Sequence, residues 1–110
     1  MVASFLLVLG VLFFFHFLAD YPLQGDFLSR AKNRNDPIPH VPWQQALFAH
    51  SFIHAGFVFL ATGSVIAFVG ELIVHAITDD LKCRGELTFN QDQMIHFGCK
   101  VAWAALAVML

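Results

Sequence analysis

Hydrophobic residues dominate four segments of the chain, and each segment is close to the length of a helix that crosses a membrane. The segments cover 1–19, 43–62, 65–81 and 92–110, and the first carries no charged residue before Asp20. A membrane-spanning helix needs about 20 mostly apolar residues. The pattern therefore predicts an all-α fold, a four-helix transmembrane bundle made of two helical hairpins.

Polar residues and turn formers mark the connections between these segments. All four prolines fall in the first loop, 20–42, where we also expect a short interfacial helix around 27–32. Gly63 and Ser64 predict a tight turn between the second and third helices, and 82–91 forms the last loop.

The first segment raises the question of a signal peptide. It lacks a basic N-terminal region and a small-residue cleavage site, so we expect it to be retained as a helix. No low-complexity tract or linker divides the chain. We therefore expect a single membrane domain over 1–110.

Basic residues predict the orientation of the bundle. Five of the six lie in the two loops 20–42 and 82–91, which share one side of a four-span protein. The positive-inside rule places these loops in the cytoplasm and both termini on the non-cytoplasmic side. The expected location is the inner (cytoplasmic) membrane, with multiple spans. The five residues are Arg30, Lys32, Arg34, Lys82 and Arg84.

Composition agrees with lipid as the main partner. The chain is 58% hydrophobic and 13% charged, with a mean hydropathy of +0.68, whereas roughly a quarter of the residues in a soluble domain are charged. A formal net charge of −2 gives no basic excess for nucleic-acid binding. Cys83 and Cys99 form neither a disulfide framework nor a C-x-x-C motif.

Each predicted helix carries one pair of histidine or aspartate residues spaced four apart. This spacing places both side chains on one face of a helix. At 1.5 Å per residue, one histidine from each helix lies roughly 8 to 12 Å inside the cytoplasmic boundary, so the four pairs meet at one level. The pairs are His16 and Asp20, His50 and His54, His75 and Asp79, and Asp92 and His96, with His54 one turn deeper than the rest.

Imidazole and carboxylate side chains together suit a divalent metal, with zinc ahead of manganese or iron. The set is larger than one tetrahedral ion requires, so either two ions share it or some members orient ligands and move protons. Two alternatives stay open: a proton or ion pathway without tightly bound metal, and a structural network of hydrogen bonds between helices. The expected ligands are His16, Asp20, His50, His54, His75 and Asp79, with Asp92 and His96 as candidate catalytic bases.

Two further charges lie deeper in the spans. Glu71 is one turn before His75 and Lys100 is one turn after His96, at similar depth on adjacent helices. An unpaired charge there is costly, so we expect a structural Glu71–Lys100 ion pair.

Polar residues also ring the cytoplasmic mouth of the predicted bundle, where ordinary interfacial solvation explains most of them. Gln24 and Lys82 are the better candidates for substrate contact, because Gln24 continues the first polar stripe and Lys82 suits an anionic headgroup. Gln93 is a third candidate. The ring comprises Gln24, Asp26, Lys32, Asp80, Lys82, Gln91 and Gln93.

Four motifs, "HFLADYPLQ", "HSFIHA", "HAITDDLK" and "DQMIH", resemble the domain-of-unknown-function 3307 family of small bacterial and phage membrane proteins. The resemblance covers nearly the whole chain. It implies a four-helix membrane domain and a phage or prophage origin, and it points to the histidine and aspartate pairs together with Gln24, Lys82 and Gln93. It implies no activity.

Three functions follow as expectations. The first is a metal-dependent hydrolase acting on a lipid or membrane-surface substrate at the inner leaflet. The second is a carrier, channel or sensor for protons or divalent metal, which needs polar residues across the whole bilayer. The third is a holin- or exclusion-type phage protein that acts by assembly and needs no site. A homo-oligomer is compatible with all three.

Overall fold

Five α-helices build the protein. The computed structural model describes residues 2–109, and within that range it contains helices and no strands, which confirms the all-α prediction. The expected short helix in the first loop is present as a helix of seven residues. The helices are α1 (Val2–Asp20), α2 (Gly25–Ala31), α3 (Trp43–Thr62), α4 (Val65–Cys83) and α5 (Phe89–Met109).

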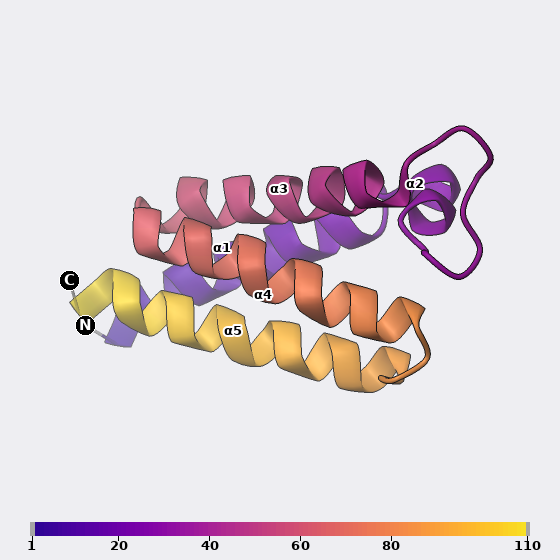
Figure 1. The fold of residues 1–110 in the computed structure, drawn as a ribbon. Coiled ribbons are helices and arrows are strands. Elements are labelled where there is room, and N and C mark those ends of the chain that lie inside the picture. Colours follow the sequence, from indigo (N-terminus) through magenta and orange to yellow (C-terminus); the bar gives the residue numbers. More distant parts are fainter. Residues whose placement is uncertain (1, 110) are drawn as a thin grey trace.

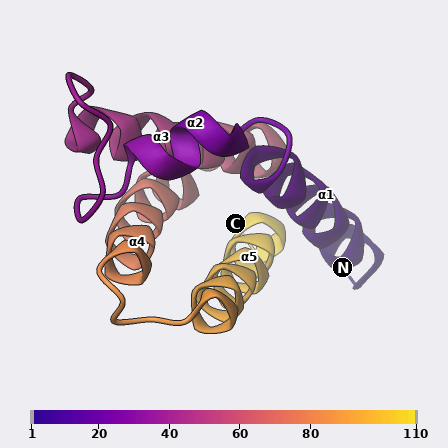
Figure 2. The same cartoon turned by 90° about the vertical axis from the view of Figure 1, so that its right-hand side faces the viewer.

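The four long helices form a bundle in which each helix packs against two neighbours. α3 lies between α1 and α4, and α5 closes the ring by contacting both α4 and α1. The start of α1, the end of α5 and the α3–α4 turn lie at one end, which we call the terminal end (Figure 1). The α4–α5 loop and α2 lie at the other, the loop end. Figure 2 shows α2 crossing over the bundle beside α3.

The α3–α4 turn has the geometry that its two residues predict. Gly63 adopts φ 68°, ψ 12°, the left-handed conformation that glycine favours at a helix C-terminus, and its N–H donates to the Phe59 carbonyl at 2.7 Å. Ser64 then caps α4, because its hydroxyl accepts a hydrogen bond from the Ala67 N–H at 3.1 Å.

Among the long helices, two ends differ from the sequence-based boundaries by more than one residue. α4 continues to Cys83, and α5 begins at Phe89, three residues before the predicted start. A reciprocal cap explains the second difference: Thr88 Oγ1 accepts from the Gln91 N–H at 3.0 Å, and Gln91 Oε1 accepts from the Thr88 N–H at 2.9 Å. The apolar pattern does not reveal this cap, which comes from the T-x-x-Q sequence.

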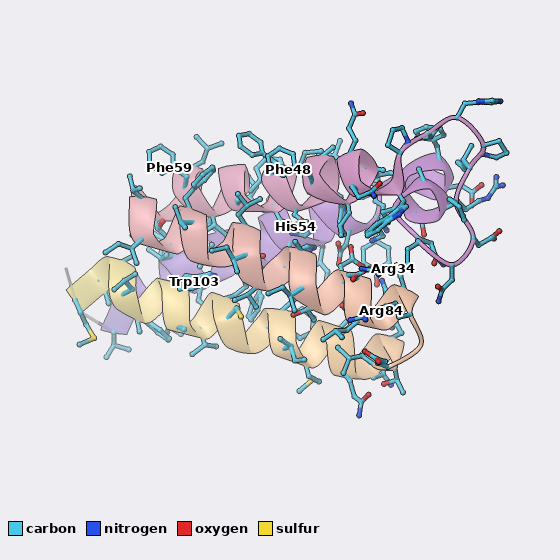
Figure 3. All side chains as sticks on the ribbon, in the orientation of Figure 1. Arg34, Phe48, His54, Phe59, Arg84 and Trp103 are labelled. Carbon is cyan, nitrogen blue, oxygen red and sulfur yellow. The ribbon has the colours of Figure 1, made fainter. Side chains whose placement is uncertain are left out.

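Burial in the bundle is inverted relative to a soluble protein. Among the described residues, nine hydrophobic side chains are buried against fourteen polar or charged ones, and large apolar side chains cover the outside. Phe48 and Phe59 point outward from α3, while His54 of the same helix points between the helices (Figure 3). Polar groups are thus gathered in the interior.

A small apolar core fills the terminal half of the bundle. It consists of Leu12, Val58, Ala67 and Ala104, one residue from each long helix. The polar interior therefore occupies the loop half, where α2 and the long first loop cover it.

Two of the helices within residues 2–109, α1 and α3, are long and apolar enough to cross a membrane. α4 and α5 fall short of that composition because they carry buried charges, Glu71, Asp79 and Asp80 on α4 and Asp92 and Lys100 on α5. The described residues thus form an all-α helical bundle in which two helices meet the length and composition of a membrane span.

Candidate metal centre

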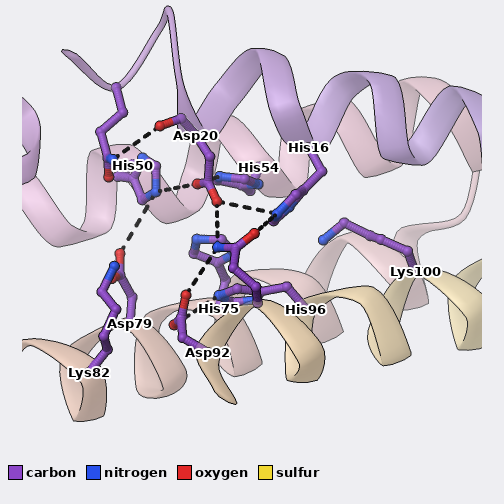
Figure 4. Close-up of polar contacts among 12 residues, drawn as sticks. His16, Asp20, His50, His54, His75, Asp79, Lys82, Asp92, His96 and Lys100 are labelled. Atoms are coloured by element: carbon purple, nitrogen blue, oxygen red, sulfur yellow. Dashed lines mark hydrogen bonds and ion pairs between the residues drawn. The ribbon is translucent and has the colours of Figure 1, made fainter. Parts of the chain in front are cut away.

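Asp20, at the end of α1, is the hub of the polar interior (Figure 4). Its Oδ1 lies 2.8 Å from Nε2 of His54 and 3.2 Å from Nε2 of His50. Its Oδ2 accepts a hydrogen bond from the Gln93 amide at 3.0 Å and lies 3.2 Å from Nε2 of His16. One carboxylate therefore draws together side chains from α1, α3 and α5.

Four residues place one potential ligand atom each within 4.8 Å of the others: Asp20, His50, His54 and His75. Around a tetrahedral zinc ion with ligand bonds near 2.0–2.1 Å, neighbouring ligand atoms are about 3.3 Å apart. The contacts of 2.8 and 3.2 Å from Asp20 to the two α3 imidazoles are already close to that spacing. The other ligand atoms lie within 4.8 Å of one another, so they would have to move closer together to hold one ion.

Both ring nitrogens of His50 are buried without a hydrogen-bond partner among the described residues. The residue is 1% exposed. Nε2 approaches Asp20 and also lies 3.7 Å from Asp79 Oδ2, but without hydrogen-bond geometry. A buried polar atom without a partner calls for an explanation, and an ion beside Nε2 supplies one.

His75 is oriented by a carboxylate on its own helix. Its Nδ1 lies 3.0 Å from Oε2 of Glu71, one turn earlier. An ionised carboxylate can only accept, so this contact places the ring hydrogen on Nδ1 and leaves Nε2 with a free lone pair. Carboxylate–histidine–metal arrangements of this kind fix the ring and strengthen it as a ligand.

Glu71 is itself held from α5. Its Oε1 accepts hydrogen bonds from Lys100 Nζ and Trp103 Nε1, both at 2.9 Å. The Glu71–Lys100 ion pair expected from the sequence is therefore present, with both side chains 1% exposed. Trp103 was not predicted as part of this group, although it lies one turn beyond Lys100 on the same helix.

Asp92 and His96 form a second pair on the cavity wall. Asp92 Oδ1 lies 3.2 Å from His96 Nε2, and the His96 ring stacks on His75 with centroids 4.1 Å apart. Gln93, on the same turn of α5, donates to Asp20, and its Oε1 lies 3.0 Å from His16 Nε2. His16 thus lies beside the other oxygen of Asp20, outside the group of four ligand atoms.

Asp79 lies outside the group of four ligand atoms and contacts two lysines. We expected a metal ligand, but Asp79 Oδ2 accepts from Lys32 Nζ at 2.6 Å and Oδ1 lies 3.3 Å from Lys82 Nζ. Lys32, expected at the solvated mouth, is 2% exposed and also donates to Gln24 Oε1. The difference arises because Lys32 directly follows α2 as its C-cap, and α2 crosses over the bundle beside α3, a placement that helical periodicity does not predict.

Asp80 points to the outer side of α4 and pairs with the same loop. Its carboxylate accepts two hydrogen bonds from Arg34, at 2.9 and 2.6 Å, and the guanidinium lies 4.4 Å above the Trp43 ring. These hydrogen bonds raise the pKa of Arg34. Lys32 and Arg34 together fasten the long loop to α4.

A cavity of about 410 Å³ opens beside the cluster at the loop end. His50, His75 and His96 reach it from three helices, and Lys32 and Lys82 lie on its wall. Gln24, Gln93 and Asp92, three of the residues expected to contact substrate or move protons, also line it. The complete lining is Asp20, Tyr21, Gln24, Gly25, Asp26, Ser29, Lys32, His50, His75, Asp79, Lys82, Phe89, Asp92, Gln93 and His96.

Buried charge is unevenly compensated around this cavity. Glu71, Asp79 and Asp80 each pair with a lysine or arginine. Asp20 and Asp92 have none within 4 Å in the described part of the chain, and they meet only histidine and glutamine. The negative charge of these two carboxylates is therefore not offset by a lysine or arginine among the described residues.

Comparison with known proteins gives one match. The profile of a family described as "Protein of unknown function (DUF3307)" matches residues 8–110, which include every residue of the polar cluster. No curated protein and no solved structure matches the chain. The match spans far more than half of the sequence, and the chain belongs to the DUF3307 family.

Proposed function

We propose that this chain is a multi-pass membrane protein that holds one divalent metal ion, with zinc as the first candidate. The protein hydrolyses a lipid or another substrate at the membrane surface. The observation that carries the proposal is the convergence of Asp20, His50, His54 and His75 on one point beside a cavity. Asp20 supplies an oxygen and the three histidines supply nitrogens, a donor set that zinc, manganese or iron accepts.

The inverted burial supports insertion in a membrane. α1, α3, α4 and α5 are 19 to 21 residues long, or about 28 to 32 Å, which matches a hydrocarbon core of about 30 Å. The charges of α4 and α5 face the interior, where a membrane protein keeps them, and apolar side chains face outward. Basic residues gather at the loop end, so we place that end in the cytoplasm of a four-span protein.

Charge favours a metal over a purely structural network. A hydrogen-bonded network of neutral histidines leaves the negative charge of Asp20 and Asp92 without compensation, at a high cost in a low-dielectric interior. One divalent ion at the Asp20 group offsets both charges. A structural network also has no need for the open cavity beside it.

One ion is a better fit than two. A second group, Glu71, His75 and His96, also brings potential ligand atoms together. Glu71, however, already accepts from Lys100, Trp103 and His75, so its oxygens are engaged. We assign Glu71 to orienting His75, and His96 to the cavity wall.

The hydrolytic step follows from the neighbours of the ion. A divalent ion lowers the pKa of a bound water to near neutral. Asp92 and His96 line the same cavity, so they would be placed to take a proton from such a water and to return it to the leaving group, and water would thereby be added across the broken bond.

The terminal half of the bundle argues against a conduit. Leu12, Val58, Ala67 and Ala104 close the interior there with apolar side chains. A carrier or channel requires polar groups or water along the whole path. The polar interior is accessible from the loop end, as a catalytic pocket requires.

Metal content tests the proposal. The protein is purified in mild detergent without chelator or histidine tag and analysed for bound zinc, manganese, iron and cobalt, before and after incubation with each metal. We expect about one equivalent in the parent and none in the His50→Ala/His54→Ala double variant, because two of four ligands are gone.

His40→Ala is the matched control, since His40 is an exposed loop histidine outside the cluster. It should bind as much metal as the parent, and circular dichroism checks that all variants keep their helices. A parent that stays free of metal after incubation contradicts the proposal, as does equal loading of the double variant.

A further inference from the structure

Two lysines share one carboxylate on the wall of the cavity. Lys32 and Lys82 lie 2.6 and 3.3 Å from the two oxygens of Asp79. Lys32 is enclosed and also donates to Gln24, whereas the Lys82 side chain is 24% exposed. The Lys82 ammonium has three hydrogens, so contact with Asp79 leaves donors for a ligand in the cavity.

The charge of the cavity interior depends on the ion. The carboxylates of Asp20, Asp79 and Asp92 line the interior of the cavity. The positive charges of the two lysines offset two of these three negative charges. Asp26 also lines the cavity, but it is exposed, and solvent screens its charge. With one divalent ion in place, the interior carries one unit of positive charge.

We propose that the Lys32–Asp79–Lys82 group is a binding site for a monoanionic phosphodiester, with Lys82 donating to a non-bridging oxygen while the metal ion binds another. This inference rests on the proposed function and specifies its substrate class. A phosphodiester brings one negative charge and makes the interior neutral, whereas a doubly charged monoester leaves one charge in excess. Lipid headgroups and soluble diesters share this chemistry.

Cobalt-loaded protein in dodecyl maltoside gives a direct test, because paramagnetic Co²⁺ broadens the ³¹P resonance of a phosphorus atom held near it. One arm of the experiment titrates dimethyl phosphate, and the other titrates micellar dioleoyl phosphatidylglycerol. Elemental analysis of the same samples reports cobalt loading independently.

Three variants test the contribution of Lys82 to phosphodiester binding. Lys82→Gln should load cobalt like the parent and weaken phosphodiester binding about tenfold, because it loses a charged hydrogen bond. Lys82→Arg keeps the charge and should largely restore binding. Arg84→Gln removes a charge two residues away on the outer side of the same helix end, and it should bind like the parent.

The outcomes separate the two proposals. Broadening in either arm that Lys82→Gln weakens and Lys82→Arg restores supports the inference, and an effect in the lipid arm alone identifies the source as a headgroup. Cobalt loading with equal broadening in the parent and Lys82→Gln, or with none in either arm, overturns the phosphodiester site alone. Failure of the parent to load cobalt or any of the other three metals overturns both proposals.

Discussion

Glu71 shows how one buried carboxylate organises its surroundings. It is 1% exposed and receives contacts from His75, Lys100 and Trp103. The lysine neutralises it, the tryptophan donates to the same oxygen as the lysine, and the other oxygen holds the histidine in one orientation. The stability of this part of the bundle and the readiness of His75 as a ligand thus depend on the same few atoms.

Lys100→Met tests that dependence. The change leaves the Glu71 charge buried without a cation, which should lower the free energy of unfolding by about 3 to 5 kcal/mol. Unfolding in mixed detergent and sodium dodecyl sulfate, followed by circular dichroism, measures the effect.

The double variant Glu71→Gln/Lys100→Met is the control. The glutamine carbonyl still accepts from Trp103 and no buried charge remains, so most of the stability should return. Equal losses in the single and double variants would show that the charge is not the cause.

The sequence predicts many of the residues that meet in the interior. Pairs spaced four apart predict shared helix faces, and their similar depth predicts that the four pairs meet. Asp20, His50, His54 and His75 do converge, although His54 was expected one turn deeper than the others. The sequence pattern does not predict how α2 and the first loop fold back on the bundle, and for that reason the contact between Lys32 and Asp79 was not expected.

At the scale of the helices, α4 and α5 approach each other through a glycine. A Cβ on Gly70 would lie 2.5 Å from Cη2 of Trp103, so only a residue without a side chain lets the indole lie there. This close approach is what allows Trp103 Nε1 to reach Glu71 across the two helices.

Gly70→Ala should therefore displace the indole, break its hydrogen bond to Glu71 and cost about 1 to 3 kcal/mol through overpacking. Thermal unfolding measures the loss, and the tryptophan emission spectrum reports the displacement.

Gly56→Ala is the matched control on α3, because nothing lies within 4 Å of a Cβ at that position. Alanine in a helix interior gains up to about 1 kcal/mol over glycine, so this variant should be as stable as the parent or more stable. A Gly70→Ala protein that matches it would refute the packing argument.

Helix positions follow well from the apolar pattern, and helix ends follow less well. α3 matches its predicted range of 43–62 because a proline precedes it and Gly63 ends it. The start of α5 depends on side-chain capping by Thr88 and Gln91, which hydropathy does not register. Local chemistry, not periodicity, decides such ends.

At the scale of the whole molecule, the positions of the termini and of the basic loops at opposite ends of the bundle predict how the protein is oriented in a membrane. In a background of Cys83→Ser and Cys99→Ser, the variants Val2→Cys and Glu86→Cys place one thiol at each end of the bundle, both at exposed positions. A membrane-impermeant maleimide applied to intact spheroplasts should label Val2→Cys at once and Glu86→Cys only after permeabilisation, because the basic loops remain in the cytoplasm. The reverse pattern contradicts the proposed orientation, and labelling of both contradicts a membrane-embedded bundle.

The two-residue turn at Gly63 and Ser64 has a consequence for biogenesis of the proposed membrane protein. α4 carries three carboxylates, and Glu71 lies nearest the middle of the helix, where one charge opposes insertion by about 2.5 to 3.5 kcal/mol, so α4 is a poor candidate for entering alone. Its short tether to α3 favours entry of both helices as one hairpin.

The order of synthesis favours early compensation of the charges on this hairpin. Lys32 and Arg34, the partners of Asp79 and Asp80, precede α3 in the chain, so the ribosome has already made them when α4 emerges. The charge of Glu71 is neutralised later, because its partner Lys100 lies on the last helix. Its neutralisation by α5 is therefore the step that completes assembly.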